Sequence, residues 1–255
     1  MTLGLPRLHG LRLKPPPVDP DRLAAERRRS LFDPNVRSRL YLGAVATCGL
    51  VGLGLLGADA RLAEYVVAAG DPWRSAADAV TDLCSVSVWG PLGVALGLGL
   101  WLWRQDVARA FLAWLALALI ASGVTAAIVH VLKFLLGRAR PRIATDYGPG
   151  VFAPLNPDYD FNSFPSGHAA DIAVLVTTVW LAAPRFGAGR LGLVWLTVGL
   201  SLAATRVLTL SHWPSDVAAG MWIGVAVTLT LHALLLRRRA QSLARYGVRA
   251  TSTIA

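Results

Sequence analysis

Three short segments combine basic, hydroxyl, histidine and carboxylate side chains at spacings that could bind and transfer an anionic group. The first, residues 133–142, reads KFLLGRARPR and places Lys133 and Arg140 seven residues apart. In a helix that spacing is two turns, or about 10 Å along the axis, so both cations point the same way. The second, residues 162–171, reads NSFPSGHAAD, and the third, residues 205–216, reads TRVLTLSHWPSD. Each lies where a polar loop meets a strongly apolar segment.

The middle segment has the composition of a helix that begins with exposed backbone donors. Ser166 is a favoured N-cap residue after Pro165, and Gly167 lets another group approach the backbone closely. Free N–H groups at a helix N-terminus favour anions, and phosphate in particular. His168 follows at once and could exchange a proton with the bound group. A single histidine at a helix end is usually structural, but this combination predicts an anion-binding site with an acid–base group.

The third segment carries Arg206, His212 and Asp216. A carboxylate four residues after a histidine can bond one ring nitrogen, fix the tautomer and leave the other nitrogen as a nucleophile or base. Taken alone, this pair could equally be a capping aspartate beside an interfacial histidine. Lys133 and Arg140 could likewise be snorkelling toward a membrane interface. Together the segments supply fixed cations, an anion cradle, two histidines and a carboxylate, which is the set that phosphoryl transfer requires.

The composition places these segments in a membrane protein. The chain is 55% hydrophobic, whereas soluble domains are about 45–50% apolar. A helix needs about 20 apolar residues to cross a bilayer. Six runs lack Asp, Glu, Lys and Arg: 41–58, 83–103, 110–132, 172–184, 191–205 and 217–236. With the fourth run extended back to Pro165 and the fifth forward past Arg206, we predict an all-α protein with six transmembrane helices, whose three polar segments all lie at the extracytoplasmic ends.

The charge distribution predicts which end faces the cytoplasm. The net charge of +10 comes from residues 1–40 and 237–255, while the chain between them is balanced. Basic tails that flank membrane spans indicate that both termini are cytoplasmic, and they make nucleic-acid binding an unsuitable explanation of the charge. We therefore predict a flexible, basic, proline-rich head over 1–39, a six-helix membrane domain over 40–236 and a basic cytoplasmic tail over 237–255.

The three segments, taken in order, resemble the motifs of the type-2 phosphatidic acid phosphatase superfamily of membrane lipid phosphatases. That superfamily carries Lys-x6-Arg-Pro, Pro-Ser-Gly-His and Ser-Arg-x5-His-x3-Asp. All three spacings occur between residues 133 and 216, with Thr205 in place of the usual serine. The resemblance implies the six-helix fold from about residue 40 onward, and it does not cover the head.

The resemblance also implies a mechanism. His212 would attack phosphorus and form a phospho-histidine, with Asp216 orienting it. His168 would protonate the leaving group and then activate water. The phosphoryl oxygens would be bound by Lys133, Arg140, Arg206, Ser166 and the N–H of Gly167. The family works without a metal, and no cluster with metal-ligand spacing appears in this sequence, so no cofactor is expected.

The predicted function is that of a lipid phosphatase at the outer face of the cytoplasmic (inner) membrane. Undecaprenyl diphosphate, phosphatidylglycerophosphate, phosphatidic acid and lipid A are candidate substrates. Arg138 and Arg142 could grip a second phosphate or contact bulk anionic lipid. Two alternatives stay open: a phosphotransferase that uses another lipid as acceptor, and a non-catalytic lipid-binding or transport protein. Vanadate-dependent haloperoxidases share the motifs, but they are soluble. The sequence predicts membrane lipids as partners and leaves the oligomeric state open.

Several other polar residues have weaker readings. Asp171, three residues after His168, would be costly in lipid, so we predict that it faces the protein interior, pairs with a nearby cation and tunes the site. His130 and His232 are read as packed helix residues. A polar stripe with three- and four-residue spacing predicts an interfacial helix before the second span: Asp71, Ser75, Asp78 and Asp82.

Overall fold

The computed structural model describes residues 27–28, 30–70, 74–82, 85–143, 150–183 and 191–245. This part of the chain is helical and contains no strand, only an isolated bridge between Arg138 and Phe152. The helices are α2 (Pro34–Leu53), α3 (Asp59–Ala68), α4 (Arg74–Asp82), α5 (Val86–Trp103), α6 (Gln105–Leu136), α8 (Gly167–Ala182), α9 (Leu191–Leu208) and α10 (Pro214–Arg245). Short turns of other helix types are η1 (Gly54–Ala58), η2 (Pro141–Ile143) and η3 (Tyr159–Phe161). The predicted flexibility of the head lies outside the described residues.

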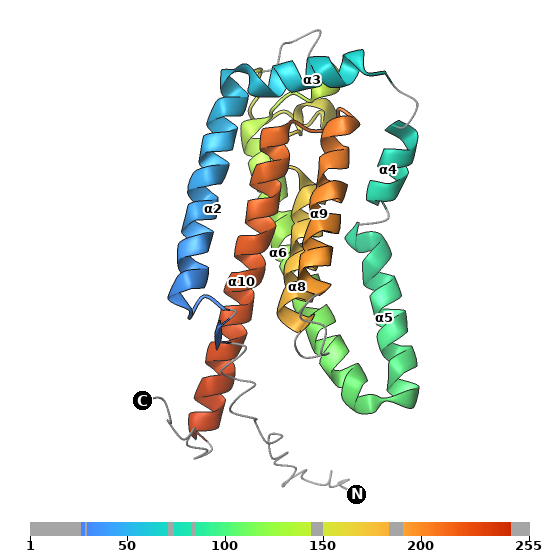
Figure 1. The fold of residues 1–255 in the computed structure, drawn as a ribbon, viewed down its shortest axis with the longest axis vertical. Helices are drawn as coiled ribbons and strands as arrows, with labels where there is room; N and C mark the ends of the chain where they lie inside the picture. The colour runs from blue at the N-terminus through green and yellow to red at the C-terminus, as the bar shows by residue number, and fades with distance from the viewer. Residues whose placement is uncertain are drawn as a thin grey trace, which may run out of the picture.

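The described residues of all six apolar runs lie in helices of this bundle or directly at their ends. In this part of the chain, four helical stretches are long and apolar enough to cross a membrane: Pro34–Ala68, Val86–Trp103, Gln105–Leu136 and Pro214–Gln241. Two more apolar stretches, Gly167–Ala182 and Leu196–Leu208, are shorter. They run alongside α10 in the same bundle (Figure 1). The protein is therefore a multi-pass membrane protein with an all-helical fold.

The helix boundaries follow local signals, but they differ from the predicted domain limits. Asp33 caps α2 by accepting from the N–H of Asn35 at 2.7 Å, and Pro34 occupies the first helical turn. The first apolar helix therefore begins seven residues before Tyr41. At the other end of the chain α10 continues beyond residue 236 to Arg245, through the first residues of the predicted tail.

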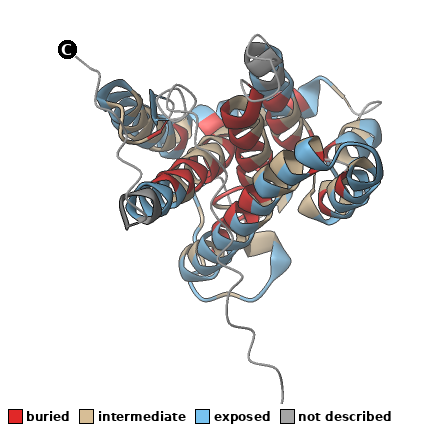
Figure 2. Cartoon of the chain, turned by 90° about the horizontal axis from the view of Figure 1, so that it is seen from below, coloured by how far each residue is buried: buried red, intermediate tan, exposed pale blue. Residues whose placement is uncertain are grey.

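Two glycines on one face of α10 bring it into close contact with α8. A Cβ atom at Gly220 would lie 2.2 Å from the carbonyl oxygen of Ser166, and one at Gly224 would lie 2.3 Å from that of Ala170. Only glycine permits this approach of two helices. The buried residues gather on the facing sides of the central helices, and the exposed residues face outward (Figure 2). The start of α8 is thereby held against the start of α10.

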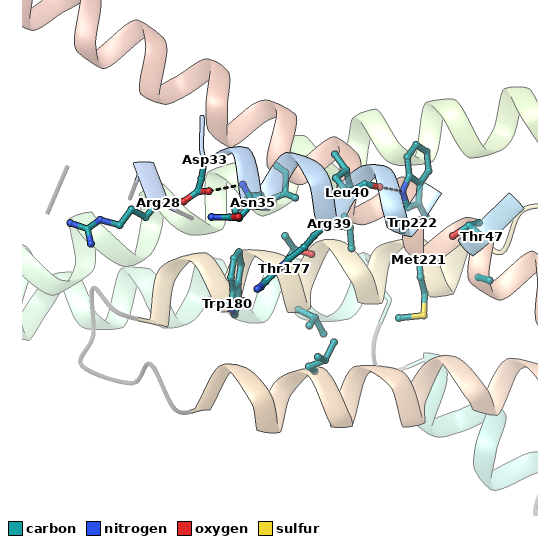
Figure 3. Close-up of a pocket in the computed structure, with 17 residues that line it drawn as sticks. Arg28, Asp33, Asn35, Arg39, Leu40, Thr47, Thr177, Trp180, Met221 and Trp222 are labelled. Atoms are coloured by element: carbon teal, nitrogen blue, oxygen red, sulfur yellow. Dashed lines mark hydrogen bonds between the residues drawn. The ribbon is translucent and has the colours of Figure 1, made fainter. Parts of the chain in front are cut away.

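α2 lies at the edge of the bundle, and α3, which follows it in the chain, crosses one end of the bundle. α2 packs along α10, where Trp222 Nε1 donates to the carbonyl oxygen of Leu40 at 3.3 Å. Beside this contact, a cavity of about 950 Å³ separates α2 from α8 and α9 (Figure 3). None of the predicted site residues lines it. Beyond α2 the chain turns at Gly57 (φ 111°), and α3 runs across one end of the bundle (Figure 1).

Candidate active site

The three motif segments meet at the end of the bundle that α3 crosses. The C-terminal ends of α6 and α9 and the N-terminal ends of α8 and α10 lie there together (Figure 1). Gly137 ends α6 in the left-handed conformation (φ 60°), and its N–H donates to the carbonyl oxygen of Lys133 at 2.8 Å. A Cβ atom at Gly137 would clash with the carbonyl oxygen of Ala153 at 1.8 Å, so this turn requires glycine. It directs the following residues back toward the start of α8.

Lys133 and Arg140 share one anchor and lack a counter-charge. The Lys133 ammonium and one Arg140 nitrogen (3.3 Å) both donate to the carbonyl oxygen of Asn162. Arg140 also donates to the carbonyl oxygens of Tyr159 (3.0 Å) and Ser211 (2.8 Å). Among the described residues, neither cation forms an ion pair with a carboxylate. Carbonyl groups therefore position these two charges without neutralising them.

The start of α8 has the predicted N-cap geometry. Ser166 adopts an extended conformation, and its hydroxyl accepts from the N–H of Ala169 at 3.4 Å. Its own N–H donates to the carbonyl oxygen of Asp216 at 3.0 Å. The N–H groups of Gly167 and His168 then have no acceptor among the hydrogen bonds of the described residues. Such unpaired donors at a helix start are suited to an anion.

His212 lies in the turn between α9 and α10, and its tautomer follows from its contact. The Nδ1 atom lies 2.8 Å from the carbonyl oxygen of Ser163. A carbonyl can only accept, so Nδ1 carries the proton and Nε2 keeps its lone pair. Asp216 lies farther away, with Oδ2 3.8 Å from Nδ1. The sequence predicted that Asp216 bonds this ring; in the structure the Ser163 carbonyl makes the bond, and Asp216 is a nearby charge.

Burial keeps His212 neutral. Its side chain is 2% exposed, and its pKa is lowered from 6.5 to about 3, mainly because burial removes the ring from water. The positive charges of Lys133 and Arg140 contribute to this lowering, while Asp216 acts in the opposite direction. The unprotonated ring is the form that can act as a nucleophile.

Asp216 organises the turn that carries His212. Its Oδ2 accepts from the backbone N–H of Trp213 at 3.0 Å and from the hydroxyl of Ser163. Its Oδ1 accepts from Arg138 at 2.6 Å. Ser163 also accepts from His212 through its carbonyl, and Trp213 is the next residue after His212. The carboxylate of Asp216 therefore holds the chain on both sides of the contact between His212 and Ser163. Asp216 is completely buried.

Two aspartates of α4 reach the site from the segment before α5. Asp78 pairs with Arg206 at 3.1 Å, and Asp82 Oδ1 lies 3.4 Å from Nε2 of the half-exposed His168. A bond between the hydroxyls of Thr81 and Thr205 also fastens α4 to α9. A helix is thus present over Arg74–Asp82, as predicted, and its interfacial position stays a prediction; Asp71 lies outside the described residues.

The structure corrects three readings of single residues. Arg138 cannot grip a second phosphate, because it is 1% exposed and its guanidinium pairs with Asp59 and Asp216. Asp171 forms no ion pair with a lysine or arginine among the described residues, and the titratable side chain that acts on it is His130 of α6. His130 itself is exposed and bonds its own helix through Ala126 O (2.8 Å), so it is not packed.

Two other readings agree with the contacts. His232 is packed as predicted, 4% exposed and with its ring 5.4 Å from that of Trp114. Arg142 is half-exposed and pairs with Asp160, so it is the one of the two extra arginines that can reach a ligand.

Several groups that the sequence did not indicate contact the predicted site residues directly or, for Asp59, through Arg138. They are Asp59, Asp78, Asp82 and Ser163. The polar stripe before α5 was visible as a helix face, and its two carboxylates could have been assigned to the site because the loop lies at the same end. The carbonyl of Ser163 carries no signal in its residue type.

Comparison with known proteins gives this geometry a family. The sequence profile described as the PAP2 superfamily matches residues 111–240, just over half of the chain, and this range contains all three motif segments. The chain belongs to the PAP2 superfamily. This is the type-2 phosphatidic acid phosphatase superfamily that the motifs resemble.

Among PAP2 proteins, the chain is similar to enzymes of different substrate classes. It is 35% identical over 117 residues to the lipid A 1-phosphatase of Rhizobium johnstonii, covering 46% of this chain and 45% of that protein. It is 28% identical over 109 residues to the undecaprenyl-diphosphatase of Sulfolobus acidocaldarius, covering 40% and 50%. The matches thus span about half the length of these relatives.

The fold of this PAP2 chain is similar to that of a solved bacterial structure. That structure is described as the first transmembrane PAP2 type phosphatidylglycerolphosphate phosphatase from Bacillus subtilis. The TM-score is 0.55 at 22% identity, over 81% of this chain and 96% of the other. At this level of identity, the likeness supports the fold and not the substrate.

Proposed function

We propose that this protein is a metal-independent lipid phosphatase that removes a phosphate from a lipid phosphate or diphosphate through a phospho-histidine intermediate. The observation that carries the proposal is the state of His212. Its Nδ1 proton is committed to the Ser163 carbonyl at 2.8 Å, and its neutral Nε2 is left as a nucleophile. Lys133 and Arg140, which pair with no carboxylate among the described residues, act electrostatically on this same ring. A phosphate is the ligand that would complete such an arrangement.

In the first step, His212 Nε2 attacks phosphorus and the bond from phosphorus to the leaving oxygen breaks. The protonated form of His168, which the nearby carboxylate of Asp82 favours, donates its proton to that oxygen. Lys133, Arg140 and the N–H groups at the start of α8 stabilise the charge on the phosphoryl oxygens. Arg206 would join them, and its ion pair with Asp78 sets its position.

In the second step, His168 takes a proton from water, and the water oxygen attacks the phosphorus of phospho-His212. The bond between phosphorus and nitrogen breaks, inorganic phosphate leaves, and both histidines return to their starting states. The phosphorylated imidazole carries positive charge, and the carboxylate of Asp216 at 3.8 Å favours this form. Ser166 contributes mainly through its cap, because its hydroxyl is buried and engaged with Ala169.

The proposed topology has six spans, two cytoplasmic termini and the site at the extracytoplasmic face of the inner membrane. α8 and α9 are shorter than the four long apolar helices but lie among them, which supports counting them as spans. The start of α2 and the end of α10 carry basic residues, and both lie at the end of the bundle opposite the one where the motif segments meet (Figure 1), which supports the orientation.

The substrate class is proposed at the level of an amphiphilic lipid phosphate. The relatives whose names refer to lipid A and to undecaprenyl diphosphate support this class. The engagement of Arg138 within the protein weakens the argument for a second phosphate from positive charge, and Arg142 alone supports it.

The test is phosphate release from detergent-solubilised lipids by the full-length protein, with and without EDTA. The panel contains phosphatidic acid, phosphatidylglycerophosphate, undecaprenyl diphosphate and lipid A. We expect release from at least one lipid, unchanged by EDTA, abolished in His212→Ala and retained in His130→Ala, which alters an exposed histidine outside the site.

Other outcomes would point to the alternatives. A phosphorylated lipid acceptor without free phosphate would establish the phosphotransferase. Loss of activity in EDTA, restored by a divalent cation, would contradict the metal-independent mechanism. No turnover on any lipid would leave a binding or transport protein.

A further inference from the structure

A buried cluster of charges lies directly behind the proposed nucleophile. One nitrogen of Arg138, Nη1, lies 2.6 Å from Oδ1 of Asp216, and the other, Nη2, lies 2.8 Å from Oδ2 of Asp59. The three side chains are 1%, 0% and 2% exposed, respectively. None of them can therefore touch a substrate from its present position. Burying charges is expensive, so a cluster this deep needs good geometry to persist.

Asp59 comes from a part of the chain remote from the motifs. It is the first residue of α3, directly after the turn at η1. Its carboxylate folds back onto Gly54, where a Cβ atom would lie only 2.5 Å from Oδ2. The same carboxylate accepts from the hydroxyl and the N–H (3.2 Å) of Ser215, the neighbour of Asp216. α3 is thus bonded to the start of α10, directly after the turn that carries His212.

Arg138 packs against two aromatic rings in addition to its ion pairs. Its guanidinium carbon lies 5.3 Å from the ring centre of Trp213 and 5.8 Å from that of Phe152. Nη1 also donates to the hydroxyl of Ser215 at 2.7 Å. This planar, bidentate arrangement cannot be reproduced by a lysine.

We propose that Arg138 and Asp59 are positioning residues, which act on catalysis through Asp216 by holding its carboxylate in the orientation that keeps His212 and Ser163 in place. This inference rests on the proposed function and deepens it. Two carboxylates and one guanidinium leave the cluster with one net negative charge, beside a ring that becomes positive when it is phosphorylated. Arg138 therefore holds Asp216 as a carboxylate, and Asp59 restores the negative charge that Arg138 offsets.

The test is a double-mutant cycle on kcat and KM with one lipid monophosphate. Arg138→Gln should lower kcat about 100-fold and leave KM within about threefold, because an uncompensated buried charge displaces Asp216 without removing a substrate contact. Asp59→Asn should lower kcat about tenfold, and Arg138→Lys should recover only part of the loss. In a protein that already carries Asp216→Asn, adding Arg138→Gln should lower kcat by a further factor of less than about three, since the residue through which Arg138 acts is already altered.

Arg104→Gln is the matched control. It removes another arginine that pairs with an aspartate, Asp106 at 3.6 Å, but at an exposed position between α5 and α6, away from the cluster. Its kcat on the monophosphate should stay within about threefold of the wild type, as expected for an exposed pair.

Two results would overturn the inference while the proposed function stands. One is an Arg138→Gln protein that folds and keeps a kcat within threefold of an active wild type. The other is a double variant, Arg138→Gln with Asp216→Asn, whose loss of kcat equals the product of the losses in the two single variants. If Arg138→Gln does not fold, the milder variants Asp59→Asn and Gly54→Ala test the inference instead. Each should lower kcat about tenfold at unchanged KM. A wild-type kcat in both variants would overturn the inference. A wild type inactive on every lipid would instead reject the proposed function.

Discussion

The Nδ1 atom of His212 lies 2.8 Å from the carbonyl oxygen of Ser163, and this single contact defines the chemistry of the ring. A backbone carbonyl can only accept a hydrogen bond, so the tautomer does not depend on whether Asp216 is charged. Asp216 instead holds Ser163 and Trp213 around the ring. The nucleophile is therefore oriented by the backbone, and the carboxylate maintains that backbone.

Stability should depend on pH through His212. Its pKa is about 3 in the folded protein and about 6.5 as an ordinary histidine. Between these values the unfolded chain binds a proton that the folded chain does not, so the free energy of unfolding falls as pH drops from about 6.5 toward 3. Thermal unfolding in detergent at pH 7.5 and 4.5 should show a larger loss of Tm for the wild type than for His212→Gln. Equal losses would show that His212 is not buried in its neutral form.

His168→Gln should separate the two proposed steps. Loss of a general acid lowers the rate by about 10²- to 10⁴-fold. A substrate with a good leaving group, such as p-nitrophenyl phosphate, does not need that proton, so the phosphoenzyme should then form and accumulate because water is not activated. Acid-quench labelling would detect it. The control, His130→Gln on an exposed face of α6, should behave as the wild type. If His168→Gln slows the turnover of lipid and of p-nitrophenyl phosphate by the same factor, His168 is not the general acid.

Asp82→Asn should move the basic limb of the pH–rate profile to lower pH. The carboxylate lies 3.4 Å from His168 Nε2 and favours the protonated ring, which is the form that donates to the leaving group. The aspartate is 69% exposed, so the pair is worth about 0.2–1 kcal/mol and the shift should be about half a pH unit. Glu64→Gln is the control, since it removes an exposed carboxylate of α3 at the same end of the bundle (Figure 1). It should leave the limb in place, and an equal shift in both variants would mean that Asp82 acts only through general electrostatics.

Gly220→Ala should destabilise the protein and lower activity together. The new methyl group would meet the carbonyl oxygen of Ser166 at 2.2 Å, where α8 and α10 start side by side. Overpacking of this kind costs about 1–3 kcal/mol, and it would disturb the bond from Ser166 N–H to Asp216. Gly123→Ala, at a helical position with no atom within 4 Å of the new methyl, should be neutral or slightly stabilising. Thermal unfolding of the two variants checks this, and equal Tm values would contradict the close helix contact.

Much of the fold was predictable because its signals are local. Each apolar run between the polar segments became a helix, since a chain in lipid must satisfy its backbone hydrogen bonds within a helix. The N-cap at Ser166 followed from residue type alone. The boundaries at Pro34 and Arg245 did not, because a helix can extend beyond its apolar run into charged residues where the interface allows it.

Arg138 shows why the rest could not be predicted. In sequence it stands among basic residues of a motif and suggests a free cation. Its actual state depends on Asp59, which is 79 residues away, and on Asp216, which is 78 residues away. Whether an arginine binds a ligand or a carboxylate of its own chain is decided by which segments pack around it.

The sequence by itself determined the set of reactive groups, their order and the membrane-spanning helices that bring them to one end of the bundle. Periodicity, charge and motif spacing are properties of neighbouring residues, so they can be read along the chain. Only the tertiary structure decided which groups are free to react. The carbonyl of Ser163 bonds a histidine 49 residues later, and two helices before the motifs supply Asp59, Asp78 and Asp82 to them. Those contacts arise from packing between segments that are far apart in the sequence, and residue type and spacing along the chain do not predict that packing.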